Sequence, residues 1–306
     1  MPLLPSGPVA GLFPGQGSQS PGMRDAVAEL TPQLLAQCLE LVGEDPFARV
    51  AESTRFAQPA IFCASVASWM ALERSLQDGE LDGAWEPIVL AGHSLGEIAA
   101  LVAAGSISAQ TGLHLAVRRG ELMAQAGERD GGGGLVAIVG ADPQQCEQLA
   151  AAHGASVAND NAPGQIVLAG SRESLRELVA AAREIGMRAI ALDVAGAFHS
   201  PAMAPAVEPF RDLLDTVEIS TPRVPVISCA SAKPIADVRS ELAQGIVRPV
   251  RWRETMLALC QQGAKEFLDL GPGKVLAGLV ARNLPDVRGV RAQSLIGSER
   301  DIEVAA

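Results

Sequence analysis

Ser94 is the central residue of a G-x-S-x-G segment, residues 92–96, that directly follows the apolar run of residues 88–91. Such a segment between a strand and a helix is typical of a nucleophile elbow, a sharp turn that exposes the serine hydroxyl above the edge of a sheet. Residues 97–104 are rich in helix formers, so strand, turn and helix occur in the required order. The sequence therefore predicts a serine nucleophile and covalent catalysis.

A serine hydroxyl becomes a good nucleophile only when a base accepts its proton, and histidine is the usual base. The chain has four histidines. His93 adjoins the serine, so an elbow directs its side chain away from the hydroxyl, while His114 falls in a predicted helix and His153 near a loop. His199, in the loop-like segment 196–201, is the predicted base by elimination.

The base and the developing oxyanion each need further support. An acid in the chain order serine, aspartate, histidine would complete a triad, and Asp160 and Asp193 occupy that interval. A dyad, in which a backbone carbonyl holds the imidazole, is equally compatible with the sequence. For the oxyanion, the elbow supplies the N–H of Leu95, and the glycine-rich loop around Gln16 is the expected second donor.

Two adjacent arginines, Arg118 and Arg119, lie on a helix predicted over residues 109–126. Arginines on a helix commonly face solvent. The alternative is that one of them turns inward and binds a carboxylate through its planar guanidinium. Both alternatives are open for either residue taken alone. An esterase for neutral substrates has no use for such a group, so an inward arginine would favour an acidic substrate.

Overall charge and cysteine content exclude several classes of function. A formal net charge of −11 over 306 residues argues against nucleic acid or an anionic membrane as a partner. The five cysteines form no C-x-x-C pair, so neither a disulfide framework nor a metal site is predicted. We expect a reduced, cytoplasmic location, because residues 1–5 do not resemble a signal peptide and no apolar stretch is long enough to span a bilayer.

Alternating strands and helices predict the fold of most of the chain. Strands are expected at residues 9–13, 88–91, 224–228 and 267–270, and one of the intervening helices is expected over residues 58–75, with Pro59 in its first turn. This alternation predicts a mainly parallel sheet with helices on both faces.

A second unit interrupts this pattern. The run Gly131–Gly134 is expected to be a hinge, because four glycines do not suit the interior of an element. Beyond it the order is β-α-β-β-α-β, typical of a ferredoxin-like domain. We therefore predict a small domain over residues 131–197, inserted into an α/β domain of residues 1–130 and 198–306. Its predicted strands lie at residues 135–139, 156–158, 165–169 and 188–194, with a loop at 159–164.

Six motifs in order make a family resemblance specific. Over almost its whole length, the chain resembles the malonyl-CoA:acyl carrier protein transacylases of bacterial fatty-acid synthesis, and it is similar to the acyltransferase domains of polyketide synthases. The motifs that carry the resemblance are Phe13–Gln19, Gly92–Glu97, Arg119-Gly120, Asn161–Gln165, Ala197–Pro201 and Leu270–Lys274.

The resemblance implies an α/β-hydrolase-like large domain with a ferredoxin-like insertion, and a ping-pong reaction. Ser94 would attack malonyl-CoA with His199 as base and then acid, while the N–H groups of Gln16 and Leu95 hold the oxyanion. The phosphopantetheine thiol of a holo acyl carrier protein would then accept the malonyl group. Arg119 would pair with the free carboxylate of malonate. No metal and no bound cofactor are implied.

The resemblance also indicates residues of the substrate pocket. Gln58 and Asn161 match pocket positions, and the segment around Phe198, residues 197–200, resembles the malonyl-selecting form of the polyketide signature. One position departs from the family. Gly245 stands where Gln or Asn is common and where the backbone carbonyl orients the histidine.

Three other hypotheses remain open on sequence grounds. The first is a stand-alone, trans-acting malonyl acyltransferase of a polyketide synthase. The second is a serine esterase or thioesterase, and the third is a non-catalytic scaffold, which the intact Ser94, His199 and Arg119 make unfavourable. Two groups of arginines are candidate contacts for an acidic carrier protein, with scattered surface residues as the alternative: Arg248, Arg251 and Arg253, and Arg282, Arg288 and Arg291.

Overall fold

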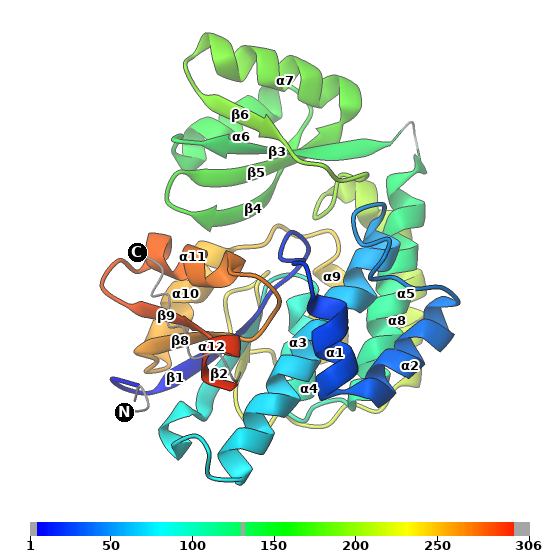
Figure 1. Cartoon of the computed structure of the whole chain (residues 1–306). Helices are drawn as coiled ribbons and strands as arrows, with labels where there is room; N and C mark the ends of the chain where they lie inside the picture. The colour runs from blue at the N-terminus through cyan, green and yellow to red at the C-terminus, as the bar shows by residue number, and fades with distance from the viewer. Residues whose placement is uncertain (1–4, 130–131, 297–306) are drawn as a thin grey trace.

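The structure, a computed structural model, describes residues 5–129 and 132–296. Strands in these residues form two separate sheets, stacked one above the other in Figure 1. The larger sheet is built from both the beginning and the end of the chain, and the smaller one from its middle. The chain has a mixed α/β fold with a parallel sheet, as predicted.

The larger sheet has the strand order β7-β2-β1-β8-β9, and all its neighbours pair in parallel. Parallel neighbours need long crossover connections, and helices fill these connections here. The predicted strand at 9–13 is confirmed, and the others agree to within a few residues. The bounds are β1 (Val9–Phe13), β2 (Pro87–Gly92), β7 (Val226–Ile227), β8 (Glu266–Asp269) and β9 (Arg288–Arg291).

Helices cover both faces of this sheet because alternate strand residues face opposite sides. Val9 and Phe13 pack in one core with helices α3, α4 and α5, whereas Ala10 and Leu12 pack in another with α10 and α11. The helices are α1 (Met23–Leu30), α2 (Pro32–Val42), α3 (Thr54–Gln77), α4 (Gly96–Ala103), α5 (Ala109–Gly127), α8 (Val207–Thr216), α9 (Val238–Gln244), α10 (Trp252–Gln261), α11 (Val275–Asn283) and α12 (Gln293–Ile296), with 3-10 turns at Gly83–Trp85 and Pro201–Ala206.

Helix α3 corrects one prediction. It begins at Thr54, before the expected start at residue 58, and Pro59 lies inside the helix beyond its first turn. The cause is Ser53, whose hydroxyl accepts a hydrogen bond from the N–H of Arg55 and so caps the helix upstream of the proline. The longer helix places Gln58 in a buried position facing α5.

The smaller sheet is antiparallel, with the order β4-β5-β3-β6. The predicted element order β-α-β-β-α-β is confirmed. Figure 1 shows α7 on the side of this sheet that faces away from the larger one, and α6 packs with α7 in one core against the same face. The elements are β3 (Gly133–Val139), α6 (Pro143–Ala152), β4 (Ser156–Ala162), β5 (Gln165–Ser171), α7 (Arg172–Glu184) and β6 (Arg188–Ala191).

Three boundaries in this part differ from prediction. Gly133 and Gly134 belong to β3, because their backbones pair with Ser171 and Gly170 without needing side chains. Residue 131 of the predicted hinge lies outside the described residues. Residues 159–162, expected as a loop, extend β4 through two irregularities in its pairing with β5. Strand β6 ends at Ala191 rather than at residue 194.

Across the residues that the structure describes, no helix combines the length and apolarity needed to cross a membrane.

Close packing of α4 on β1 depends on a glycine. A Cβ atom at Gly96 would lie 1.9 Å from the backbone oxygen of Phe13, which cannot move without displacing the sheet. We therefore expect Gly96→Ala to lower the free energy of unfolding by about 2 kcal/mol or more, measured by urea denaturation.

Gly278→Ala, on α11, is the matched control, because a Cβ atom there meets nothing within 4 Å. Its expected effect is neutral or stabilising by up to about 1 kcal/mol. Equal unfolding midpoints for the two variants would contradict the packing argument.

Candidate active site

Ser94 lies in the turn between the end of β2 at Gly92 and the start of α4 at Gly96. Its φ of 54° is in the left-handed region, which non-glycine residues rarely adopt and which is often stored as strain at functional sites. The turn is fixed at both sides: the N–H of His93 donates to the carbonyl of Phe13 at 2.8 Å, and the N–H of Ser94 approaches the Cys229 sulfur at 3.4 Å. The predicted strand–turn–helix arrangement is present.

His199 meets the serine from the segment that follows the smaller sheet. Its Nε2 lies 2.7 Å from Ser94 Oγ, although 105 residues separate the two in sequence. His199 also has a left-handed φ, of 59°, and its loop is closed by a 2.6 Å hydrogen bond from the Ser200 hydroxyl to the carbonyl of Ala197. The histidine chosen by elimination therefore contacts the predicted nucleophile.

The other ring nitrogen of His199 settles the tautomer. Nδ1 lies 2.9 Å from the carbonyl oxygen of Gly245 and 3.1 Å from that of Arg248. Carbonyl oxygens only accept hydrogen bonds, so Nδ1 carries the proton and Nε2 presents a lone pair to the Ser94 hydroxyl. Gly245, where the sequence departs from the family, still supplies its carbonyl.

No carboxylate occupies the third position of a triad, because both carbonyls already surround Nδ1. Asp160 pairs instead with Arg253 at 2.6 Å. Asp193 borders the cavity that contains Ser94 and makes no hydrogen bond to His199 in the described residues. The geometry is that of a serine–histidine dyad.

His199 is uncharged in this environment. Burial lowers the pKa of its imidazole to about 3, and the positive charge of Arg119 acts in the same direction. An uncharged imidazole can accept the serine proton at neutral pH, as a general base must.

Arg119 turns inward from α5 and is only 4% exposed. One guanidinium nitrogen donates to Gln58 Oε1 at 2.8 Å, and another donates to Ser94 Oγ at 3.1 Å. Burial lowers its pKa to about 10, which leaves it charged at neutral pH. No carboxylate forms an ion pair with it among the described side chains, whereas Arg118 pairs with Glu121 at 2.9 Å. Arg119 is thus a buried, charged guanidinium that lines the same cavity as Ser94.

A cavity of about 340 Å³ surrounds these groups. Its size is in the range of small-molecule sites. It lies between the two sheets: Ser94 and Arg119 belong to elements of the larger unit, and Leu135 and Val167 come from β3 and β5. All eight residues predicted for the site line it, namely Gln16, Gln58, Ser94, Leu95, Arg119, Asn161, Phe198 and His199.

The loop carrying Gln16 is pressed against the elbow. A Cβ atom at Gly15 would lie 2.6 Å from the carbonyl oxygen of His93, so only glycine allows this approach. His93 itself does not contact the hydroxyl: its Nε2 lies 2.9 Å from Asn161 Oδ1, and burial lowers its pKa. Gln16 and Leu95 thus line the same cavity as Ser94.

Two residues beneath the elbow were not predicted. Glu97 is buried, and its Oε1 accepts a 2.7 Å hydrogen bond from the N–H of Cys229. Burial raises the pKa of this carboxyl to about 7. An acidic residue within the apolar helix α4 was a visible signal, but nothing local in the sequence connects it to Cys229, which lies 132 residues away.

No group of three or more His, Cys, Asp or Glu side chains in the described part of the chain is arranged to hold a metal ion.

A serine–histidine pair at a turn between a parallel strand and a helix is typical of enzymes with a serine nucleophile. Comparison with known proteins identifies the family. The acyl transferase domain family matches residues 12–304, and the chain belongs to that family.

Two curated relatives show the range of this similarity. Polyketide biosynthesis protein ThaF of Burkholderia thailandensis is 37% identical over 291 residues, which cover 91% of this chain and 24% of that protein. Malonyl CoA-acyl carrier protein transacylase of Bacillus subtilis is 36% identical over 293 residues, which cover 90% of each. The chain thus spans about a quarter of the first relative and most of the second.

Solved structures agree with the fold. Malonyl-CoA:acyl carrier protein transacylase FabD of Xanthomonas oryzae matches with a TM-score of 0.83 and 34% identity, over 92% of this chain and 93% of that one. A malonyl-transacylase solved in complex with its type II polyketide synthase acyl-carrier protein, PlMCAT:AntF, matches with a TM-score of 0.85 and 31% identity, over 94% and 99%.

The uncharged state of His199 is testable by nuclear magnetic resonance of the imidazole nitrogens. We expect the free protein to keep His199 neutral, with the proton on Nδ1, from pH 8 down to pH 5, because its pKa lies near 3 rather than near the ordinary value of about 6.5. His199→Ala identifies the resonances. A titration midpoint near 6.5, or a proton on Nε2, would contradict the geometry.

Proposed function

We propose that the chain transfers a malonyl group from malonyl-CoA to the phosphopantetheine thiol of an acyl carrier protein, through a malonyl ester on Ser94. One observation carries the proposal: the Ser94 hydroxyl contacts both a neutral imidazole at 2.7 Å and an unpaired, buried guanidinium at 3.1 Å. The first activates a nucleophile, and the second selects an acyl group with a free carboxylate.

In the first half-reaction, Ser94 Oγ forms a bond to the thioester carbonyl carbon as its proton passes to His199 Nε2. The N–H groups of Gln16 and Leu95 are the proposed donors to the oxyanion. Collapse breaks the carbon–sulfur bond, and the CoA sulfur leaves with the proton held by His199. In the second half-reaction, the carrier thiol gives its proton to Nε2 and attacks the ester, and Ser94 Oγ leaves with that proton.

Arg119 is proposed to bind the malonyl carboxylate. Gln58 fixes its guanidinium at 2.8 Å, so the charged fork is oriented before substrate arrives. Asn161 and Phe198 are proposed as further contacts of the acyl group, because both line the cavity. An esterase for neutral substrates would gain nothing from a buried cation next to its nucleophile, which disfavours that alternative.

We also propose a division of the chain into two domains. Residues 1–130 and 198–306 form an α/β-hydrolase-like domain, and residues 131–197 form a ferredoxin-like domain inserted in it. The strand order β4-β5-β3-β6 with two helices on one face supports the second assignment, and the parallel sheet with the elbow after β2 supports the first. The reaction would occur between the two domains.

The pathway is proposed to be fatty-acid synthesis, with service to a polyketide synthase as the alternative. Some similar proteins are named for polyketide biosynthesis, and others are named malonyl CoA-acyl carrier protein transacylase with no pathway stated. The solved complex of a similar transacylase with an acyl-carrier protein supports a carrier protein as acceptor. The proposed steps use side chains of this chain and the two substrate thiols, so no bound cofactor or metal is assigned.

Loss of the nucleophile gives the direct test. Intact-mass spectrometry after mixing with malonyl-CoA is expected to show a malonyl adduct on the native protein and none on Ser94→Ala, because only Ser94 contacts the base. Addition of holo acyl carrier protein should move the adduct to the carrier. An adduct that is lost to water and never reaches the carrier would favour a hydrolase, and an adduct on Ser94→Ala would remove the assignment.

The preference for malonyl-CoA over acetyl-CoA tests the proposed role of Arg119. Arg119→Ala is expected to lower the preference for malonyl-CoA over acetyl-CoA by about one to two decades, since a hydrogen bond to a charged group contributes about 1.5–3 kcal/mol. Arg118→Ala, on the outward side of the same helix, is the control and should leave the preference unchanged. The measurement is kcat/KM for both thioesters. Equal preferences in the native protein and Arg119→Ala would assign the carboxylate to another group.

A further inference from the structure

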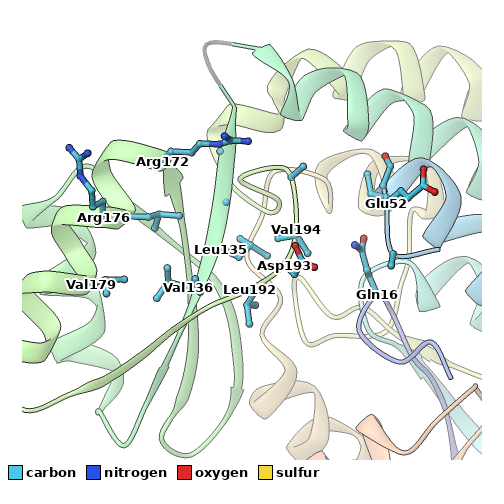
Figure 2. Close-up of a pocket in the computed structure, with 18 of the residues that line it drawn as sticks. Gln16, Glu52, Leu135, Val136, Arg172, Arg176, Val179, Leu192, Asp193 and Val194 are labelled. Atoms are coloured by element: carbon cyan, nitrogen blue, oxygen red, sulfur yellow. The ribbon is translucent and has the colours of Figure 1, made fainter. Parts of the chain in front are cut away.

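A second cavity, of about 690 Å³, adjoins the one that holds Ser94. Figure 2 shows it between α7 and β3 on one side and the Gln16 loop on the other. The two cavities are lined in common by six residues, so a molecule that reaches Ser94 can extend from one into the other. The shared residues are Gln16, Thr54, Leu135, Leu192, Asp193 and Val194.

Three arginines of α7 line this second cavity: Arg172, Arg176 and Arg183. Their spacing, i, i+4 and i+11, places them within about 40° of one another around the helix, in a row about 16 Å long. In Figure 2, Arg172 extends from α7 toward β3, and Arg176 lies one turn further along at the rim. Leu175 and Val179 line the same cavity and give this face apolar contact area.

No acidic side chain among the described residues neutralises these arginines. None of the three forms an ion pair or a side-chain hydrogen bond within the described ranges, and all three are exposed. The glutamates that follow each of them in sequence lie about 100° around the helix and do not line the cavity. Of the acidic residues that do line it, Glu52 pairs with Arg49 at 2.6 Å and Asp193 stands near the entrance to the Ser94 cavity.

Of the six other candidate arginines, none lines either cavity, and three form ion pairs with carboxylates. Arg251 pairs with Glu254, Arg253 with Asp160, and Arg288 with Glu266. In a chain of net charge −11, the unpaired row on α7 is therefore a distinctive local concentration of positive charge.

We propose that Arg172, Arg176 and Arg183 bind the phosphate groups of coenzyme A while its thioester lies at Ser94. This inference rests on the proposed function. The nucleotide end of coenzyme A carries a pyrophosphate and a ribose phosphate, and arginine binds phosphate oxygens through its planar fork. A concave cavity of about 690 Å³ is in the size range of small-molecule sites, and it is continuous with the cavity that holds Ser94.

A donor that lacks phosphates separates this role from catalysis. The second-order rate constant of Ser94 acylation is measured in single turnovers with malonyl-CoA and with malonyl-pantetheine. For Arg172→Gln/Arg176→Gln, this rate constant is expected to fall about tenfold or more with malonyl-CoA and to stay unchanged with malonyl-pantetheine. Raised ionic strength should reduce the native preference for malonyl-CoA over malonyl-pantetheine.

The matched control, Arg24→Gln/Arg211→Gln, removes the same charge from α1 and α8, away from both cavities, and should behave as the native protein. Equal losses with both donors would overturn the assignment and indicate a structural effect. A loss confined to transfer onto holo acyl carrier protein would overturn it in favour of the acceptor. Absence of any adduct on the native protein would overturn the proposed function, and this inference with it.

Discussion

The site depends above all on a buried cation, Arg119, which forms no ion pair with any carboxylate that the structure describes. Arg119 is held by Gln58 and donates to the Ser94 hydroxyl, and its charge disfavours protonation of His199. Burying an unpaired charge costs free energy unless hydrogen bonds or a ligand compensate it. Hydrogen bonds to Gln58 and Ser94 and the nearby Glu97 carboxyl compensate part of this charge. Under the proposed function, the malonyl carboxylate would complete the compensation.

The two sheets contribute different things to the cavity. Ser94 comes from the larger, parallel unit, where β2, the turn and α4 fix a strained φ by packing on both sides. His199 comes from the segment that leaves the smaller sheet, and the carbonyls of Gly245 and Arg248 hold its ring from a third region. The distance between Ser94 and His199 therefore depends on the hydrogen bonds that hold the imidazole to the larger unit, although His199 directly follows the smaller sheet in the chain. Contacts such as the pairing of Asn159 with Val250 tie the two units together near the site.

Structural features set by neighbouring residues could be predicted from the sequence, whereas features set by contacts between distant residues could not. The elbow at Ser94 could be predicted because its strand, turn and helix are adjacent in the sequence. His199 could be predicted as the base because the chain has only four histidines. The first turn of α3 was misplaced because Pro59 gave a stronger apparent start than the Ser53 cap. The buried contact of Glu97 with Cys229 and the second carbonyl at Arg248 left no signal, since tertiary contacts between distant residues produce no periodicity. Of the two arginines left open on α5, only packing decides which one is inside.

Electrostatics link the binding of an acidic acyl group to its activation. In the free site, His199 has a low pKa because it is buried and because Arg119 repels a second positive charge. A carboxylate bound to Arg119 cancels that repulsion, and so raises the pKa of the imidazole toward the range in which a base accepts a proton effectively. Under the proposed function, a malonyl group would thus strengthen the base that attacks through Ser94, while an acetyl group would leave it weak. Selectivity for malonyl over acetyl would then arise in the chemical step as well as in binding. Only interactions that are stronger in the transition state than in the bound substrate accelerate the chemical step.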